Sequence, residues 1–423
     1  SKHVVCLVVS VVAAVSLSTL DWRALPQRGP AHVALAAAAD ASGSTPLDER
    51  PRAQSSQSTE PPPHVNNAQS QSTEPPAHNK SSHPAFWVFN NLPLTFRELQ
   101  KSIHYPVVAT LWEAFETAGF EVRYYNVTDL DALMLEIPEY VAAHRLQPFI
   151  WNLLWEHSHM KGEVSKFMMR SPTRRFSLVG AYVMIYNYEP NLIQLTHITS
   201  TAKVLRVHEI WDYSHGNLEF YSKHTQRPFT FRYFPPGCAK ALQLAPSQSA
   251  RTRDEAHVGF AGKWMQRSAY SRKVFNASGA IRDKSDADSR ASWRTFLETY
   301  PVQLSTHSAF NRHQTFEGCR AAVLLSNGAC VMAEHSHKLD EEEWQGLVKF
   351  IAPHEAKQAF KGLLSHPEAI RHCQIRSQAD FCSKFDPTRL LHNSGFLETA
   401  KQLRVEQGGR PAYRSPWKGK TGT

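Results

Sequence analysis

A strand, a helix, a glycine and a second strand follow one another where the apolar part of this chain begins. Residues 86–89 (FWVF) form a short apolar run that stops at two asparagines. Residues 107–118 carry apolar side chains at helical spacing, Gly119 interrupts them, and residues 120–125 alternate as a strand does. This order predicts a parallel sheet, because the helix returns the chain to the edge where the first strand began.

Three more apolar runs follow, and polar residues come at or just after the end of each. The runs cover residues 149–155, 181–188 and 204–211. In an open α/β sheet, ligands bind beyond the carboxyl ends of the strands. The polar residues at these ends are therefore predicted to line a cleft that takes an acceptor: Glu156, His157, Asn187, Asp212 and Ser214.

A second series of elements begins at residue 257, after a polar stretch that lacks periodicity. Its predicted strands cover residues 257–261, 302–306, 329–333 and 347–351, and its helices cover 314–326 and 356–364. Asp340 is predicted to cap the next turn, with Glu343 as its capping-box partner. The whole pattern predicts an α/β chain with two Rossmann-like parallel-sheet lobes and a cleft between them.

The N-terminal segment has a different character. Residues 4–20 are uncharged and mostly apolar, follow Lys2, and just reach the thickness of a bilayer core at about 1.5 Å per residue. They predict a signal anchor or a signal peptide rather than a core element, because the next sixty residues offer nothing to pack against. Residues 21–84 are predicted to be a disordered stem, since they are rich in Ser, Gln and Pro and contain the repeat QSSQSTEPPPH/QSQSTEPPAH.

An anchor, a stem and a folded body predict a single-pass protein of the secretory pathway, in the ER or Golgi membrane with a lumenal body. Secretion and plastid targeting are alternatives. Asn79, Asn126 and Asn276 each begin an N-x-[ST] triplet, which accepts glycans in that compartment. The predicted divisions are the anchor (1–20), stem (21–84), N-terminal acceptor lobe (85–238), linker (239–256), C-terminal donor lobe (257–392) and tail (393–423).

The net charge of +9 belongs entirely to the predicted lobes. Residues 1–84 contain six basic and six acidic side chains, so their charges cancel. An excess of basic groups favours an anionic partner, although it can also serve solubility alone. No nucleic-acid-binding motif accompanies the excess, so nucleic acid is not predicted as a partner.

Several common catalytic motifs are absent from the sequence. It contains no P-loop, no G-x-S-x-G, no H-E-x-x-H, no C-x-x-C pair and no G-x-G-x-x-G after a strand. Asp286 and Asp288 have the spacing of a cation-binding D-x-D but lie in a polar loop. The histidines at 307, 313, 335 and 337 fit no standard metal site, so no metal is predicted. Cys319/Cys330 and Cys373/Cys382 are predicted to be free thiols or occasional bridges.

Two stretches of the second half carry groups suited to a phosphate. Gly262 lets a backbone approach a phosphate closely, and Lys263 and Arg267 would offset its charge. The alternative is an ordinary turn with solvated basic residues. Glu317 and Arg320 share a face at the start of a helix, where a diphosphate is attracted, although they also fit an exposed ion pair.

With these residues in place, the chain resembles the GT-B glycosyltransferase-like proteins of the spore-coat and capsular-polysaccharide type. The matching stretches, in the family's order and spacing, are YVMIYNYEP, VHEIWDYSHGNLEFY, FRYFPPGC, VGFAGKWMQRS and TFEGCRAAVLLSNGACVMAE. They cover residues 181–364, and residues 86–125 match more faintly.

The resemblance implies roles for individual residues. It implies that Glu317 contacts the nucleotide ribose and that Gly262 and Arg267 contact the diphosphate. The predicted donor-binding set is Gly262, Lys263, Arg267, His307, Glu317, Arg320, Asn327, Gly328 and Glu334. No residue maps onto a known catalytic base, and Glu189, at the end of a first-lobe strand, is the predicted one.

The resulting prediction is an enzyme, a metal-independent glycosyltransferase. It transfers a sugar from a nucleotide-sugar, which is a substrate rather than a cofactor, to a glycan or protein acceptor. The alternative is a non-catalytic protein that binds a carbohydrate or a partner through the same cleft.

Overall fold

A computed structural model describes residues 84–102, 105–153, 172–187, 198, 206–224, 229–244, 258–260, 267–279, 281–282, 296–297, 299–307 and 315–408. These residues belong to one compact unit, residues 73–423. The predicted anchor and nearly all of the predicted stem lie outside the described residues. Among the residues that are described, no helix has the length and apolar character needed to cross a membrane.

The first sheet has six parallel strands in the order β2-β1-β3-β4-β5-β6. They are β1 (Ala85–Asn90), β2 (Glu121–Asn126), β3 (Phe149–Leu153), β4 (Tyr182–Asn187), β5 (Glu209–Asp212) and β6 (Thr230–Tyr233). The strands predicted from the apolar runs are confirmed, but β5 is shorter than predicted. Arg206 has a left-handed backbone (φ 54°), which is incompatible with a strand, so pairing begins only at Glu209.

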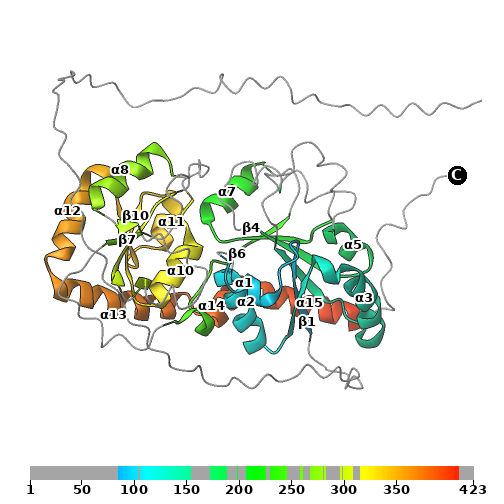
Figure 1. The fold of residues 1–423 in the computed structure, drawn as a ribbon. Coiled ribbons are helices and arrows are strands. Elements are labelled where there is room, and N and C mark those ends of the chain that lie inside the picture. Colours follow the sequence, from blue (N-terminus) through cyan, green and yellow to red (C-terminus); the bar gives the residue numbers. More distant parts are fainter. Residues whose placement is uncertain are drawn as a thin grey trace, which may run out of the picture. The chain divides into compact units, whose positions relative to one another are not determined.

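The helices of the first lobe connect these strands and cover the sheet (Figure 1). They are α1 (Phe96–Leu99), α2 (Tyr105–Thr117), α3 (Leu130–His144), α5 (Pro172–Leu178) and α7 (His215–His224), with 3-10 turns at Val127–Asp129 and Lys240–Leu242. Helix α2 is the one predicted from its spacing. Gly119 follows it with φ 80°, a conformation that glycine adopts without steric cost.

The second sheet has five parallel strands in the order β11-β10-β9-β7-β8. They are β7 (Val258–Phe260), β8 (Ile281–Arg282), β9 (Val302–Ser305), β10 (Cys330–Glu334) and β11 (Val348–Ile351), with helices α8 (Ala269–Ser278), α10 (Gly318–Ser326), α11 (Lys338–Glu343) and α12 (Pro353–Leu364). Helix α12 begins at Pro353, three residues before the predicted start at 356.

Both sheets share one topology, since in each the second strand lies outside the first and the later strands continue on the other side. The strand order therefore reverses between β1 and β3 in the first sheet and between β7 and β9 in the second. In doubly wound sheets a ligand crevice forms at this reversal. The predicted α/β class with two Rossmann-like parallel sheets is confirmed.

Three C-terminal helices lead from the second sheet back to the first (Figure 1). They are α13 (Pro367–Lys384), α14 (Pro387–Asn393) and α15 (Phe396–Gly408). The Phe396 ring lies 5.1 Å from that of Phe149 and 5.4 Å from that of Trp211, both on the first sheet. The predicted C-terminal tail (393–423) thus includes a helix that packs on the first lobe.

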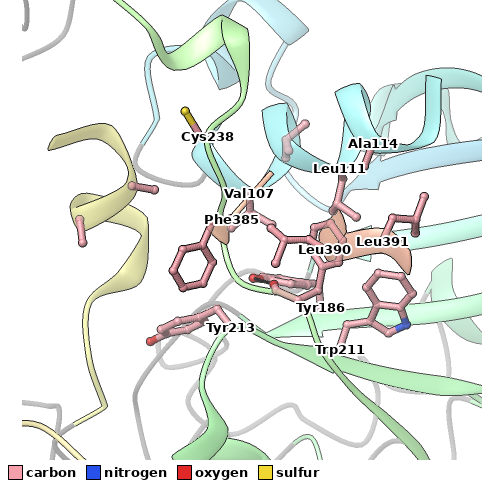
Figure 2. Packing of buried hydrophobic residues seen from close by; sticks show 14 of the residues in the cluster. Val107, Leu111, Ala114, Tyr186, Trp211, Tyr213, Cys238, Phe385, Leu390 and Leu391 are labelled. Carbon is pink, nitrogen blue, oxygen red and sulfur yellow. Dashed lines mark hydrogen bonds between the residues drawn. The ribbon is translucent and has the colours of Figure 1, made fainter. Parts of the chain in front are cut away.

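One hydrophobic cluster contains side chains from both lobes. Leu390 and Leu391 of α14 lie among Leu111 of α2 and the sheet residues Tyr186 and Trp211 (Figure 2). The same cluster includes buried residues of the second lobe: Phe316, Ala321, Leu324, Val331 and Trp344. Because this apolar surface is removed from water, it stabilises the contact between the lobes.

The cysteine pairing differs from both predicted pairs. Disulfides join Cys238 to Cys382 and Cys330 to Cys373, and Cys319 is not bridged. Residues 373 and 382 lie nine positions apart on α13, about 13 Å along the helix, which exceeds the roughly 7 Å reach of a disulfide. Residues 319 and 330 lie near the two opposite ends of α10, so they cannot meet either.

The glycan acceptor predicted at Asn126 is also wrong for the folded chain. The side chain is buried, its Nδ2 donates to the Leu94 carbonyl (3.1 Å), and its Oδ1 accepts from the Thr128 amide (2.7 Å). A glycan on Nδ2 would displace the first of these bonds. Asn276 is exposed on α8, and Asn79 lies outside the described residues.

Candidate functional site

Three charged side chains meet where the second sheet reverses its strand order. Glu317 Oε1 lies 2.9 Å from Arg267 Nη1, and Glu317 Oε2 lies 3.0 Å from Arg320 Nη2. The side chains of Arg267, Glu317 and Arg320 are 5%, 16% and 18% exposed, respectively. We call these three residues the arginine clamp. The predicted alternative, an ion pair between Glu317 and Arg320, is present, but both side chains are largely buried rather than exposed.

The strands on either side of the reversal hold this clamp in place. Arg267 Nη1 donates to the carbonyl of Thr306, the residue after β9, at 2.5 Å. The guanidinium carbons of Arg267 and Arg320 lie 5.3 and 5.8 Å from the ring centre of Phe260, the last residue of β7. Carbonyl and ring both attract cations, so the carboxyl ends of β7 and β9 together position the two arginines.

The clamp has one more positive charge than negative at neutral pH. Burial opposes ionisation of Glu317, but the charges of Arg320 and Arg267 hold its pKa below the ordinary value. Burial also lowers the pKa of Arg320 to about 10, so this guanidinium is still charged at pH 7. Glu317 precedes the first residue of α10, whose N-terminus adds partial positive charge.

Three buried polar atoms around the clamp lack a hydrogen-bond partner among the described residues. They are Arg267 Nε, Arg320 Nη1 and Thr306 Oγ1. Buried donors are almost always bonded, and an unpaired one costs about 1–3 kcal/mol. A compact anion that accepts from these donors would satisfy them and neutralise the excess charge. The chemistry of these groups therefore suits an anion such as a phosphate group.

Glu334 and His307, both predicted in the donor site, lie together at the same edge. Glu334 Oε2 accepts from Ser271 Oγ (2.6 Å) and from the His307 amide (3.1 Å). His307 Nε2 lies 2.9 Å from the His335 carbonyl. These contacts join α8, β9 and β10, so they hold the edge beside the clamp in shape.

Asn327 and Gly328 do not belong to this site. Asn327 Nδ2 donates to the Leu242 carbonyl (2.9 Å) and its Oδ1 accepts from the Leu244 amide (2.6 Å). Both residues follow the last turn of α10, about 15 Å along the helix from Glu317. A turn that precedes a strand lies at the amino edge of a parallel sheet, opposite the ligand edge, so their predicted role is wrong.

Asp212 and Asn187, predicted to line the cleft, are fully buried. Asp212 Oδ2 accepts from Asn187 Nδ2 (2.8 Å) and Tyr221 OH (2.9 Å), and Oδ1 accepts from the Ser214 amide and Asn217 Nδ2 (both 3.0 Å). Four donors thus occupy both oxygens. Asp212 organises the carboxyl edge of the first sheet rather than facing a substrate, which corrects the prediction for both residues.

The remaining predicted residues have mixed outcomes. Ser214 Oγ donates to Asp340 of α11, at 2.7 Å to the nearer oxygen. Asp340 lies inside α11 and does not cap the turn after it, so that prediction is wrong.

Outside the described residues lie Glu156, His157, Glu189, Gly262 and Lys263. Within the described residues, no group of three or more His, Cys, Asp or Glu side chains could hold a metal ion.

Sequence analysis missed Phe260, Thr306, Ser271 and Asp340. Phe260 and Thr306 come at or directly after the ends of predicted strands, so the strand-end rule applied to this lobe would have found them. The contact of Asp340 with the first lobe could not be found in the local sequence, because Ser214, His215 and Gly216 lie more than one hundred residues away from it.

The buried carboxyl of Asp212 predicts an unusual pH dependence. Burial raises its pKa to about 7, so the folded chain retains a proton that the unfolded chain releases above about pH 4. Its contribution to the free energy of unfolding is therefore largest at low pH and is lost as the pH rises through 7. From pH 5 to pH 8, the free energy of unfolding of the wild type should fall by roughly 3 kcal/mol relative to that of Asp212→Asn. Urea unfolding of both proteins measures this change. A constant difference would show that Asp212 does not titrate in this range.

Comparison with known proteins adds no sequence relative. No protein-family model matches the chain, and a search of curated proteins finds no match. Solved structures similar to this one include Anabaena HepE in complex with UDP-glucose (TM-score 0.45, 9% identity, 75% of this chain and 100% of that chain). T4 phage BGT in complex with its UDP-glucose substrate is another (TM-score 0.48, 10% identity, 75% and 99%).

Proposed function

We propose that the protein is a glycosyltransferase that transfers a sugar from a nucleotide-sugar donor to a glycan or protein acceptor, without an essential metal ion. The observation that carries this proposal is the arginine clamp. It offers excess positive charge, and buried donors that have no partner among the described residues, at the strand-order reversal of a Rossmann-like sheet.

The clamp suits the charge that develops during such a transfer. The bond between the sugar's anomeric carbon and the diphosphate breaks, and the electron pair leaves with the nucleoside diphosphate. Arg267 Nε and Arg320 Nη1 would donate to that diphosphate, and the N-terminus of α10 would add to its stabilisation. Two guanidinium groups can thus supply the positive charge that a cation supplies in other transferases. Gly262 and Lys263 are proposed to complete the phosphate site.

Glu317 and Glu189 have separate proposed roles. Glu317 pairs with Arg267 and Arg320 through its two carboxylate oxygens, and a carboxylate here suits a ribose hydroxyl as a further donor. Glu189 is proposed as the general base that takes the proton of the acceptor hydroxyl while its oxygen attacks the anomeric carbon. A uridine diphosphate sugar is the first donor to test, since the similar structures named above hold UDP-glucose. A place in the spore-coat or capsular-polysaccharide type is part of this proposal.

We propose a secretory-pathway location, with residues 4–20 as membrane anchor or signal peptide and the lobes in the lumen. Two disulfides support an oxidising compartment, where such bonds persist.

A non-catalytic binding protein on the same scaffold is a second candidate. Among the six strand ends described in the first sheet, only that of β5 is acidic, and its Asp212 already accepts four hydrogen bonds. A base would thus have to come from elsewhere in the chain, as Glu189 would.

Ligand screening and turnover separate the two candidates. We expect UDP or GDP to raise the Tm of the protein, and the matching monophosphate to raise it less, because one phosphate cannot reach all the donors of the clamp. Hydrolysis of a nucleotide-sugar in the presence of EDTA would support the transferase. Stabilisation without turnover would support the binding protein, and no stabilisation by any nucleoside diphosphate would refute the role of the clamp.

A further inference from the structure

Asp340 is a buried carboxylate at the contact between the two lobes. It lies within α11 and is 2% exposed. From the first lobe, its Oδ1 accepts from the amides of His215 (2.9 Å) and Gly216 (3.4 Å), and Ser214 Oγ lies 3.0 and 2.7 Å from its two oxygens. From its own lobe, Oδ2 accepts from the Phe316 amide at 3.2 Å.

The approach of the two lobes at this point depends on small residues and on charge. Gly216 lies against His337, and a Cβ at this position would come within 2.7 Å of the imidazole ring. The three residues that donate to Asp340 from the first lobe stand at the start of α7, where a carboxylate is stabilised by free amides and the helix dipole. Asp340 therefore caps a helix of the other lobe rather than its own.

Three consecutive residues connect Asp340 to the arginine clamp. Thr315 Oγ1 donates to Asn217 Oδ1 of α7 at 3.0 Å, the Phe316 amide donates to Asp340, and Glu317 pairs with both arginines. Asn217 in turn donates to Asp212. The segment that places Glu317 is thus held by the first lobe on one side and by the clamp on the other.

We propose that Asp340 is a positioning residue that holds the arginine clamp in the geometry that binds an anion. The identity of this anion rests on the proposed function, whereas the geometry does not. Because Asp340 holds the Phe316 amide, it fixes the position of Glu317, and Glu317 in turn positions the two guanidinium groups. Arg267 Nε and Arg320 Nη1 then stay directed at the phosphate position. Through this network the first lobe controls the affinity for a nucleoside diphosphate without contacting it.

Asparagine at position 340 is the sharpest test, because it keeps the size of the side chain. Asp340 uses both oxygens as acceptors, so an amide group would turn a donor towards either the start of α7 or the Phe316 amide. In Asp340→Asn we expect about tenfold weaker UDP binding by calorimetry and faster amide hydrogen exchange at residues 315–318. Asp386→Asn is the matched control, since Asp386 caps α14 through the Arg389 amide away from this network.

Two further measurements distinguish positioning from general destabilisation. In an Arg320→Met background only Arg267 is left to be positioned, so the effect of Asp340→Asn on UDP affinity should shrink, whereas its effect on Tm should persist. Ser214→Ala removes one of the three first-lobe donors to Asp340, so it should weaken UDP binding less than Asp340→Asn does. It tests the proposal even if Asp340→Asn fails to fold. Unchanged exchange at 315–318 in both variants would overturn the proposal. If wild-type UDP binding is absent, the proposed function fails, and the exchange data alone decide the role of Asp340.

Discussion

Replacing Arg320 with methionine is expected to weaken UDP binding by about ten- to a hundredfold. A hydrogen bond from a charged donor contributes about 1.5–3 kcal/mol, and the substitution removes such a donor together with the excess positive charge of the clamp. Methionine retains contact with the Phe260 ring, and Glu317 keeps its bond to Arg267. Calorimetric titration of both proteins with UDP at one salt concentration measures the effect.

Arg376→Met supplies the control for this change. Arg376 is 79% exposed on α13 and pairs only weakly with Asp380 at 3.2 Å, so its loss alters the net charge equally without touching the clamp. Equal weakening in both variants would mean that long-range charge, not the clamp, attracts the nucleotide. Unchanged affinity in Arg320→Met would remove Arg320 from the site.

Replacing Glu209 with alanine is expected to lower the free energy of unfolding by about 3–5 kcal/mol. Glu209 is fully buried, and its two oxygens each lie 2.6 Å from a nitrogen of Arg232. Tyr182 OH and Trp211 Nε1 also donate to it, at 3.0 and 2.7 Å. Alanine would leave a buried guanidinium without its counter-charge and two further donors without their acceptor.

Urea unfolding measures this effect, with Glu398→Ala as control. Glu398 is 72% exposed on α15 and lies 3.7 Å from Lys401, so its loss should change stability by less than about 1 kcal/mol. Arg232 also donates to the Ser394 carbonyl and to Thr399 Oγ1. Faster amide exchange in α15 should therefore accompany the loss of Glu209. A stability equal to that of the wild type would show that water reaches Arg232.

Much of the fold could be predicted because local sequence patterns specify it. The apolar runs at β1, β3, β4 and β10 mark strands that are buried on both faces, and Gly119 marks the end of α2. Helix α15 was missed because its stabilisation comes from Phe396 packing on a sheet far away in sequence. The topology that the two sheets share likewise appears only in their pairing.

The candidate site divides in the same way. Arg267, Glu317 and Arg320 could be selected from the sequence, because their charge and their place near strand and helix ends are local properties. The burial of Asp212, the exclusion of Asn327 and the disulfide partners of Cys238 and Cys330 could not be, since each depends on which strand ends and helix ends lie at the same edge.

The sequence by itself determined three features of this protein. These are a parallel α/β body, an excess of positive charge confined to that body, and arginines next to the start of a helix. Only the tertiary structure decided which of these groups are paired. It placed one carboxylate between two arginines and joined the clamp to the other lobe through Asp340. Within the part of the chain that the structure describes, it also left three buried polar atoms around the arginines without a partner. The reason is that hydrogen bonds and ion pairs act over about 3 Å, and chain folding alone brings residues this close when they are distant in sequence.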